Sequence, residues 1–234
     1  MRPLLYNAVI LVACAACSLA FFHLSLDNGF WHTDDYTYLS HNLHMTESSK
    51  LALFDSAPPY KFQPLVYGTS YWLFHRFAFE PRGYFLFNIL VHALNSFLVY
   101  LLVRILLRDR AIALLSALLF VCTVGSYGKT VMRASGLEDL MITTMTLLTM
   151  VCYFRNELSS GGRTWSVWFL AALVFFVGSM FTRSTSFAIL GAFLAFNYFF
   201  RRDTGRRVIG RNFVILAVIA AAALLVKTRV FHYA

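Results

Sequence analysis

The sequence predicts an all-α, polytopic membrane protein with about seven transmembrane helices. Of its 234 residues 59% are hydrophobic, the mean hydropathy is +0.64, and only 13% are charged. A soluble domain carries roughly 25% charged residues, so this chain lacks the polar side chains needed to cover a water-soluble body of its size. The excess apolar surface must face lipid, where helices satisfy their own backbone hydrogen bonds.

Candidate membrane spans are apolar segments that approach the required length of about 20 residues. They are 4–22, 84–107, 111–127, 137–154, 165–182, 184–200 and 208–226. We interpret the first segment as an uncleaved helix, because Phe21 and Phe22 extend it past its small residues; a cleaved signal peptide is the alternative. We treat residues 1–234 as a single transmembrane domain.

The distribution of arginine predicts the orientation of these helices. Cations are densest in the loops near Arg104, Arg155 and 201–211, so these loops are expected in the cytoplasm together with the N-terminus. The long loop 23–83 then lies outside the cell or in an organelle lumen. Its many aromatic residues are typical of a membrane interface, and we expect interfacial helices at about 34–46 and 64–79, separated by Pro58-Pro59.

The net charge of +9 fits the same interpretation, since the cations cluster at the ends of apolar segments. The expected partner is therefore the lipid bilayer, and no nucleic-acid partner is expected. Cys14 and Cys17 form a C-x-x-C motif, but inside an apolar run they are interpreted as small packing residues rather than as a redox or zinc site.

The most distinctive polar stretch is 31–36, Trp-His-Thr-Asp-Asp-Tyr, which places Asp34 and Asp35 soon after the first helix. Adjacent carboxylates near apolar surface are costly unless they are paired or hydrated. A functional interpretation makes them a general base. The simpler alternative is that they favour the N-terminus of a helix, where acids and Thr are common.

A helix that starts at Asp34 places Asp34, Thr37, His41 and His44 on one side, by the 3.6-residue period. A carboxylate and two imidazoles on one face suit a divalent metal. We therefore name Asp34, His41 and His44 as candidate metal ligands; the cofactor itself is otherwise open.

Three cations are predicted on the same outer side, against the topology rule: Lys129, Arg133 and Arg183. Phosphate binding would explain them, because Arg makes bidentate contacts with phosphate and neighbouring Ser and Thr add hydroxyl donors. Contact with lipid headgroups is the alternative. Glu138 and Asp139 are interpreted as acids that favour the N-terminus of the 137–154 helix.

Asn88, His92 and Asn95 share one face of the 84–107 helix. Polar side chains at that depth usually face protein, so they are predicted to form hydrogen bonds between helices.

Several of these stretches together resemble the GT-C glycosyltransferases, and most closely their protein O-mannosyltransferase-like branch. The resemblance rests on the acidic pair in the first outer loop, on Gln63-Pro64-Leu65 and on 83–95, Gly-Tyr-Phe-Leu-Phe-Asn-Ile-Leu-Val-His-Ala-Leu-Asn. The stretch 134–140 resembles the Ser-Gly-Arg-x-Asp-Leu-Leu motif of that branch. The resemblance covers nearly the whole chain.

The resemblance implies a GT-C-like fold and a transferase that takes a sugar from a polyprenyl-phosphate donor at the outer or lumenal membrane face. Asp34 and Asp35 would then be the catalytic acids, and Lys129, Arg133 and Arg183 would bind the lipid phosphate.

The chain also departs from the branch. Where many members carry Ser-Lys-Glu, it has Arg183-Ser184 and lacks the acid. Such enzymes usually continue past seven helices, so we expect this chain to correspond to the shared N-terminal seven-helix module. A non-catalytic membrane subunit that binds a protein partner, or a lipid-phosphate-binding scaffold, is the alternative function.

Overall fold

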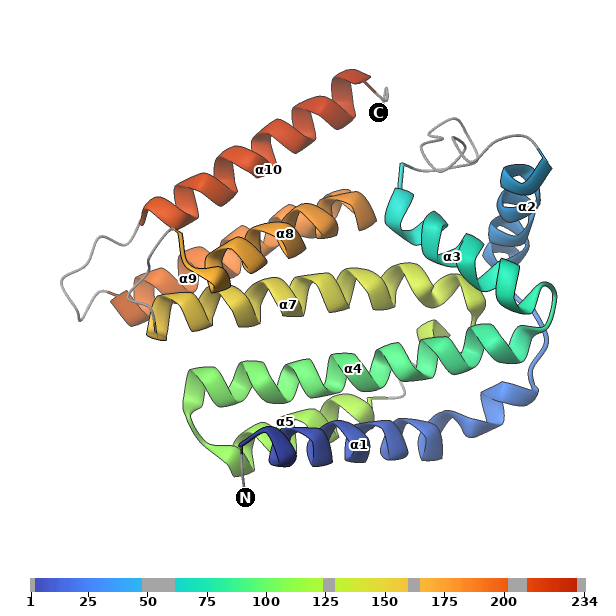
Figure 1. Cartoon of the computed structure of the whole chain (residues 1–234), viewed down its shortest axis with the longest axis horizontal. Coiled ribbons are helices and arrows are strands. Elements are labelled where there is room, and N and C mark those ends of the chain that lie inside the picture. Colours follow the sequence, from blue (N-terminus) through green and yellow to red (C-terminus); the bar gives the residue numbers. More distant parts are fainter. Residues whose placement is uncertain (1–2, 48–61, 124–128, 160–164, 202–209, 231–234) are drawn as a thin grey trace.

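The structure is a computed structural model that describes residues 3–47, 62–123, 129–159, 165–201 and 210–230. These residues are mostly helical and include no β-strand, as the sequence predicted (Figure 1). The Pro58-Pro59 separator and the end of the predicted 111–127 segment lie outside the described residues.

The helices follow the predicted segments closely. They are α1 (Pro3–Phe22), η1 (His23–Asp27), α2 (Thr33–Glu47), α3 (Pro64–Phe77), α4 (Pro81–Leu107), α5 (Arg110–Val121), η3 (Ala134–Gly136), α7 (Leu137–Ser159), α8 (Val167–Thr182), η4 (Ser184–Ala188), α9 (Ile189–Arg201) and α10 (Arg211–Val230).

Three helical stretches among the described residues are long and apolar enough to cross a membrane: Leu5–Asp27, Pro81–Leu107 and Ala134–Leu158. The other predicted spans form shorter apolar helices: Arg110–Val121, Val167–Thr182, Thr185–Phe199 and Arg211–Val226. The predicted 184–200 segment differs most, because it opens with the 3-10 turn η4 before α9 begins.

Local sequence explains where several helices begin. Pro64 and Pro81 occupy the first turns of α3 and α4, where the missing N–H costs nothing. The side chain of Asp109 accepts hydrogen bonds from two backbone N–H groups of α5, and that of Ser166 accepts one from α8.

The apolar helices lie alongside one another, while α2 and α3 lie across one end of the bundle, where α4 and α7 begin (Figure 1). α7 packs most closely against α8 and α4, and α4 also packs against α5 and α1. α3 contacts α4, α7 and α8. Helices α2 and α3 are therefore held over the ends of the central helices.

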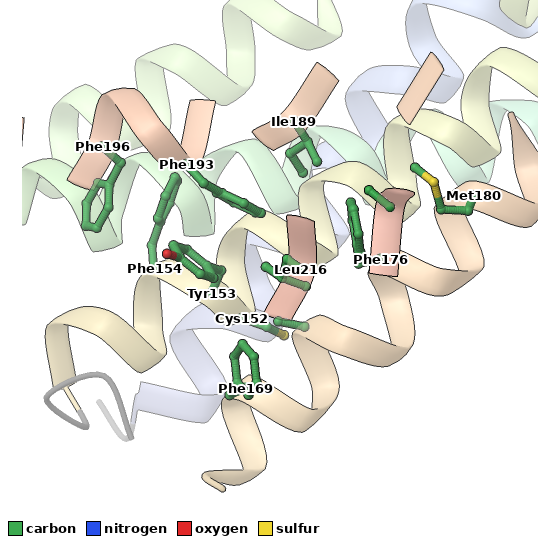
Figure 2. Packing of buried hydrophobic residues seen from close by; sticks show 12 residues of the cluster. Cys152, Tyr153, Phe154, Phe169, Phe176, Met180, Ile189, Phe193, Phe196 and Leu216 are labelled. Carbon is green, nitrogen blue, oxygen red and sulfur yellow. The ribbon is translucent and has the colours of Figure 1, made fainter. Parts of the chain in front are cut away.

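The largest apolar core joins α7, α8, α9 and α10 (Figure 2). In it the rings of Tyr153 and Phe193 are stacked with their centroids 4.1 Å apart. A second cluster joins α1, α4 and α5 around Tyr100. Cys14 is buried there as a packing residue, which confirms that interpretation of its position, and both Cys14 and Cys17 are free thiols.

The polar face of α4 makes the predicted bonds between elements. The side-chain amide of Asn88 donates to the carbonyl of Arg133 at 2.8 Å, and that of Asn95 donates to the carbonyl of Leu140 at 3.1 Å. The hydroxyl of Thr144 donates to Oδ1 of Asn95 at 2.7 Å. These bonds fix the start of α7 against α4.

Candidate functional site

The N-terminus of α2 is built around two aspartates that play different parts. Asp35 is fully buried. Its Oδ1 accepts the backbone N–H of Ser135 at 2.7 Å, and its Oδ2 accepts the backbone N–H of His32 at 3.3 Å. Both oxygens are therefore engaged by backbone donors, and Asp35 ties α2 to the η3 turn, 100 residues away in the sequence.

Asp34 has the opposite environment. Its side chain is 60% exposed, and its Oδ2 lies 3.4 Å from Nδ1 of His32. The same Nδ1 lies 3.2 Å from the backbone N–H of Asp34 and can accept that hydrogen bond when the imidazole is neutral. Asp34 is thus the carboxylate of the pair that is accessible for chemistry.

The N-terminus of α7 carries a second acidic pair, which makes contacts between side chains. Asp139 accepts hydrogen bonds from Arg183 and Arg133. Nη1 of Arg183 lies 2.9 Å from its Oδ1, and Nη2 of Arg133 lies 3.3 Å from its Oδ2. Nε of Arg183 lies 3.6 Å from Oε1 of Glu138. The two arginines therefore converge on one carboxylate at the beginning of α7.

Glu138 is also held by two neutral donors. Nε2 of Gln63 donates to its Oε1 at 2.7 Å, and the hydroxyl of Tyr38 donates to its Oε2 at 3.3 Å. Burial, followed by the nearby Glu138 carboxylate, raises the pKa of Tyr38 well above its ordinary value. The phenol stays protonated as a result, which suits its role as a donor.

A close approach of two turns sets the position of α7. A Cβ added to Gly136 would lie 1.7 Å from the carbonyl oxygen of Thr130, so no larger residue fits without movement of the backbone. Gly136 ends η3, directly before α7. The glycine therefore allows the turn that carries Ser135 to lie against residues 129–131.

These elements enclose a polar pocket of about 230 Å³ at the end of the bundle. Its lining residues come from α2, α3, α7 and the segments around them: Asp34, Thr37, Tyr38, Gln63, Tyr67, Arg133, Ser135, Glu138, Asp139 and Arg183. The lining includes carboxylates, guanidinium groups, hydroxyls and an amide. Such a set can bind a charged and hydroxylated ligand and can move a proton.

The pocket unites several of the predicted site residues. Asp34, Arg133 and Arg183 line it together, although they lie far apart in the sequence. Lys129 is exposed and is not a lining residue, and Asp35 is buried and does not line the pocket. The role of Lys129 in phosphate binding stays a prediction.

The candidate metal ligands are not brought together. Asp34 and His44 are exposed, whereas the ring of His41 is buried with its centroid 4.2 Å from that of Tyr67. At about 1.5 Å per residue, His44 lies roughly 15 Å along α2 from Asp34, too far for both to bind one ion. Within the ranges that the structure describes, no group of three or more His, Cys, Asp and Glu side chains is placed to hold a metal.

Sequence reasoning missed Glu138, Asp139, Gln63 and Tyr38. It interpreted the α7 acids as helix-stabilising residues, which their position in the first turn of α7 allows. The overlooked signal is that Glu138 and Asp139 lie only five and six residues after Arg133, so an ion pair was available within the same segment.

Comparison with known proteins gives one match. The family model described as "Dolichyl-phosphate-mannose-protein mannosyltransferase" matches residues 63–231, which is more than half of the chain. Neither the curated proteins nor the solved structures give a match. The matched range includes every lining residue of the pocket that lies outside α2.

Proposed function

Because the chain belongs to the dolichyl-phosphate-mannose-protein mannosyltransferase family of GT-C glycosyltransferases, we propose that it transfers a sugar from a polyprenyl-phosphate donor at the outer or lumenal face of a membrane. One observation supports this above all: the accessible carboxylate of Asp34 and the guanidinium groups of Arg133 and Arg183 line a single pocket. Transfer from a lipid phosphate needs a base for the acceptor and cations for the leaving group.

In this proposal Asp34 is the general base. It takes the proton of an acceptor hydroxyl while the hydroxyl oxygen bonds to the anomeric carbon of the sugar. The bond from that carbon to the phosphate oxygen breaks, and the polyprenyl phosphate leaves with the electron pair. Asp35 does not share this role, since it is buried and both of its oxygens accept backbone N–H groups.

Arg133 and Arg183 bind the phosphate. Their shared contact with Asp139 holds both guanidinium groups beside the pocket before any ligand arrives. Arginine in a fixed position stabilises the negative charge that develops on a leaving phosphate better than a mobile cation does. This arrangement also gives Asp139 a positioning role that does not require contact with the substrate.

The membrane arrangement follows from the same proposal. The four shorter apolar helices cross the membrane together with the three long ones, giving seven spans with the N-terminus in the cytoplasm. The pocket then faces outward, next to α2 and α3 at the interface. Accessibility of single cysteines to a membrane-impermeant reagent tests this: a cysteine at Asp27 should react from outside, and one at Arg108 should not.

The catalytic proposal is tested with membranes that contain the full chain. Transfer of label from polyprenyl-phosphate [³H]mannose to membrane acceptors is measured for the wild type, Asp34→Asn and Asp27→Asn. Asp27 is a matched control, because its carboxylate is also exposed in the first outer loop but lies outside this pocket. Asp34→Asn should lower transfer by about 100-fold or more, the usual contribution of a general base.

The alternative, a non-catalytic scaffold that binds lipid phosphate, predicts another pattern. The wild type would bind the donor without transferring the sugar, and Asp34→Asn would behave like Asp27→Asn. A wild type that binds the donor without transfer would remove the transferase proposal, whereas transfer that Asp34→Asn leaves unchanged would remove Asp34 as the base.

A further inference from the structure

Three buried polar atoms in the pocket lack a hydrogen-bond partner among the described residues. They are Oε1 of Gln63, Oγ of Ser135 and Nε of Arg133. Gln63 is 4% exposed and Ser135 is 6% exposed, and all three residues line the same pocket. Buried polar groups are normally paired, so their concentration at one place indicates that a ligand or ordered water completes them.

The orientation of the Gln63 amide is fixed by its neighbour. Its NH₂ group must face the Glu138 carboxylate, since only that end can donate to Oε1 at 2.7 Å. The carbonyl end is therefore the free acceptor. Glu138 is itself fixed by the Tyr38 hydroxyl, so the direction of the amide is set by a chain of contacts rather than by chance.

Ser135 and Arg133 are also fixed at one end and open at the other. The backbone N–H of Ser135 is bound by Asp35, which leaves the hydroxyl free to rotate. Nη2 of the Arg133 guanidinium donates to Asp139, and the backbone carbonyl of Arg133 accepts from Asn88. The pocket thus offers one acceptor, one donor and one group that can do either.

The chemical groups attached to a donor phosphate differ in whether they can form hydrogen bonds with these atoms. The prenyl chain on one side has no polar atoms and cannot satisfy them. The sugar on the other side carries hydroxyl groups that both donate and accept. The phosphate oxygens only accept hydrogen bonds, so they can satisfy Nε of Arg133 but not the carbonyl oxygen of Gln63, which needs a donor such as a sugar hydroxyl.

We propose that Gln63 and Ser135 form a surface that recognises the hydroxyl groups of the donor sugar, next to the phosphate-binding Arg133, with Glu138 as the positioning residue for Gln63. This inference rests on the proposed function and adds to it the part of the pocket that selects the sugar. Because these atoms are shielded from solvent, small movements of the side chains that cover them must accompany sugar binding.

The test separates recognition of the sugar from recognition of the phosphate. Two probes are compared by calorimetry on the full chain in detergent: farnesyl-phosphate mannose, and farnesyl methyl phosphate. Both are phosphodiesters with one negative charge, and they differ in the sugar. We expect the wild type to bind the mannose probe roughly 10- to 100-fold more tightly, because each added hydrogen bond to the sugar is worth about 2- to 10-fold in affinity.

Variants then assign this preference to residues. Gln63→Leu and Ser135→Ala should each lower the preference by about 5-fold or more, while the affinity for farnesyl methyl phosphate changes by less than about 2-fold. Ser135→Ala keeps the backbone N–H that Asp35 binds, so it tests the proposal even if Gln63→Leu does not fold. Asn42→Leu is the matched control, since it removes a buried amide of α2 that lies outside the pocket.

The outcomes are distinct. If both variants keep the wild-type preference, the sugar-recognition surface is overturned and the transferase proposal stands. If the wild type binds neither probe, both proposals fail. If Asn42→Leu lowers the preference as much as Gln63→Leu does, the effect is structural and the assignment to Gln63 is wrong.

Discussion

The beginnings of α2 and α7 each carry two adjacent acids in the first turn, yet the two pairs are used in different ways. At α2 one carboxylate is fully buried against backbone N–H groups, and the other is exposed to the pocket. At α7 both carboxylates contact side chains, including two arginines, an amide and a phenol.

The buried carboxylate of the α2 pair therefore anchors two segments to each other, whereas the α7 pair controls the position and the net charge of the arginines. A buried carboxylate that accepts backbone N–H groups, as Asp35 does, holds two segments together and is not accessible to a substrate. Carboxylates that bind arginines instead determine where the cations lie and how much net positive charge the pocket presents. With three carboxylates and two guanidinium groups in its lining, the pocket positions cations without becoming strongly cationic.

The largest expected effect comes from the η3 turn, which Asp35 binds and which leads directly into α7. Gly136→Ala places a Cβ against the Thr130 carbonyl, so the backbone of η3 or of Thr130 must move. We expect a loss of more than about 2 kcal/mol of stability, as for other overpacked positions. Thermal unfolding in detergent measures it, with Gly29→Ala as the control, because nothing lies within 4 Å of a Cβ there.

Asp35→Asn should destabilise the protein, and Asp34→Asn should not. The asparagine at 35 retains one acceptor and turns an NH₂ group toward a backbone N–H, which costs about 1–3 kcal/mol at a buried site. Asp34 is exposed, so its replacement should leave the unfolding midpoint unchanged within about 1 °C. Equal midpoints for the two variants would contradict the assignment of Asp35 as a structural anchor and Asp34 as the base.

Asp139→Asn should strengthen anion binding. The asparagine keeps an acceptor for an arginine and removes one negative charge from the pocket, so farnesyl methyl phosphate should bind about 3- to 10-fold more tightly at low salt. The effect should shrink as ionic strength rises. Weaker binding would mean that the loss of the second contact that positions the arginines outweighs the removal of one negative charge.

The smallest effect is expected at Lys129. It is exposed and lies outside the pocket lining, so Lys129→Ala should change the affinity for the same probe by less than about 2-fold. Arg183→Ala is the comparison and should weaken binding by about 10-fold or more, because it removes a guanidinium from the pocket. A large effect at Lys129 would restore it to the phosphate site that the sequence suggested.

Helix positions were predictable because the length of an apolar run and a proline at its start are local signals. Pro64 marked α3 correctly, and Asn95 pointed to a hydrogen bond between α4 and α7 that the structure confirms, whereas Asn88 bonds to the carbonyl of Arg133 just before η3. The roles of the two acidic pairs were harder to predict. A carboxylate in a first turn satisfies the same local rule whether it anchors, binds an arginine or serves as a base.

The candidate site depended on contacts across the fold. Asp35 meets Ser135 across 100 residues, and Gln63 meets Glu138 across 75. No helical period relates such positions, so the sequence grouped Asp34 with His41 and His44 by the spacing of one helix. The structure instead groups it with Arg133 and Arg183.

The amides of α4 have a consequence for biosynthesis. Asn88 and Asn95 find their partners in residues 133–144, which the ribosome makes about 40 to 50 residues later. Until then α4 carries two amides that are costly to leave unpaired in hydrocarbon. We expect nascent α4 to stay beside the insertion machinery and to be released only when α7 emerges. A photocrosslinker at residue 95 in arrested chains of increasing length would show the moment of release.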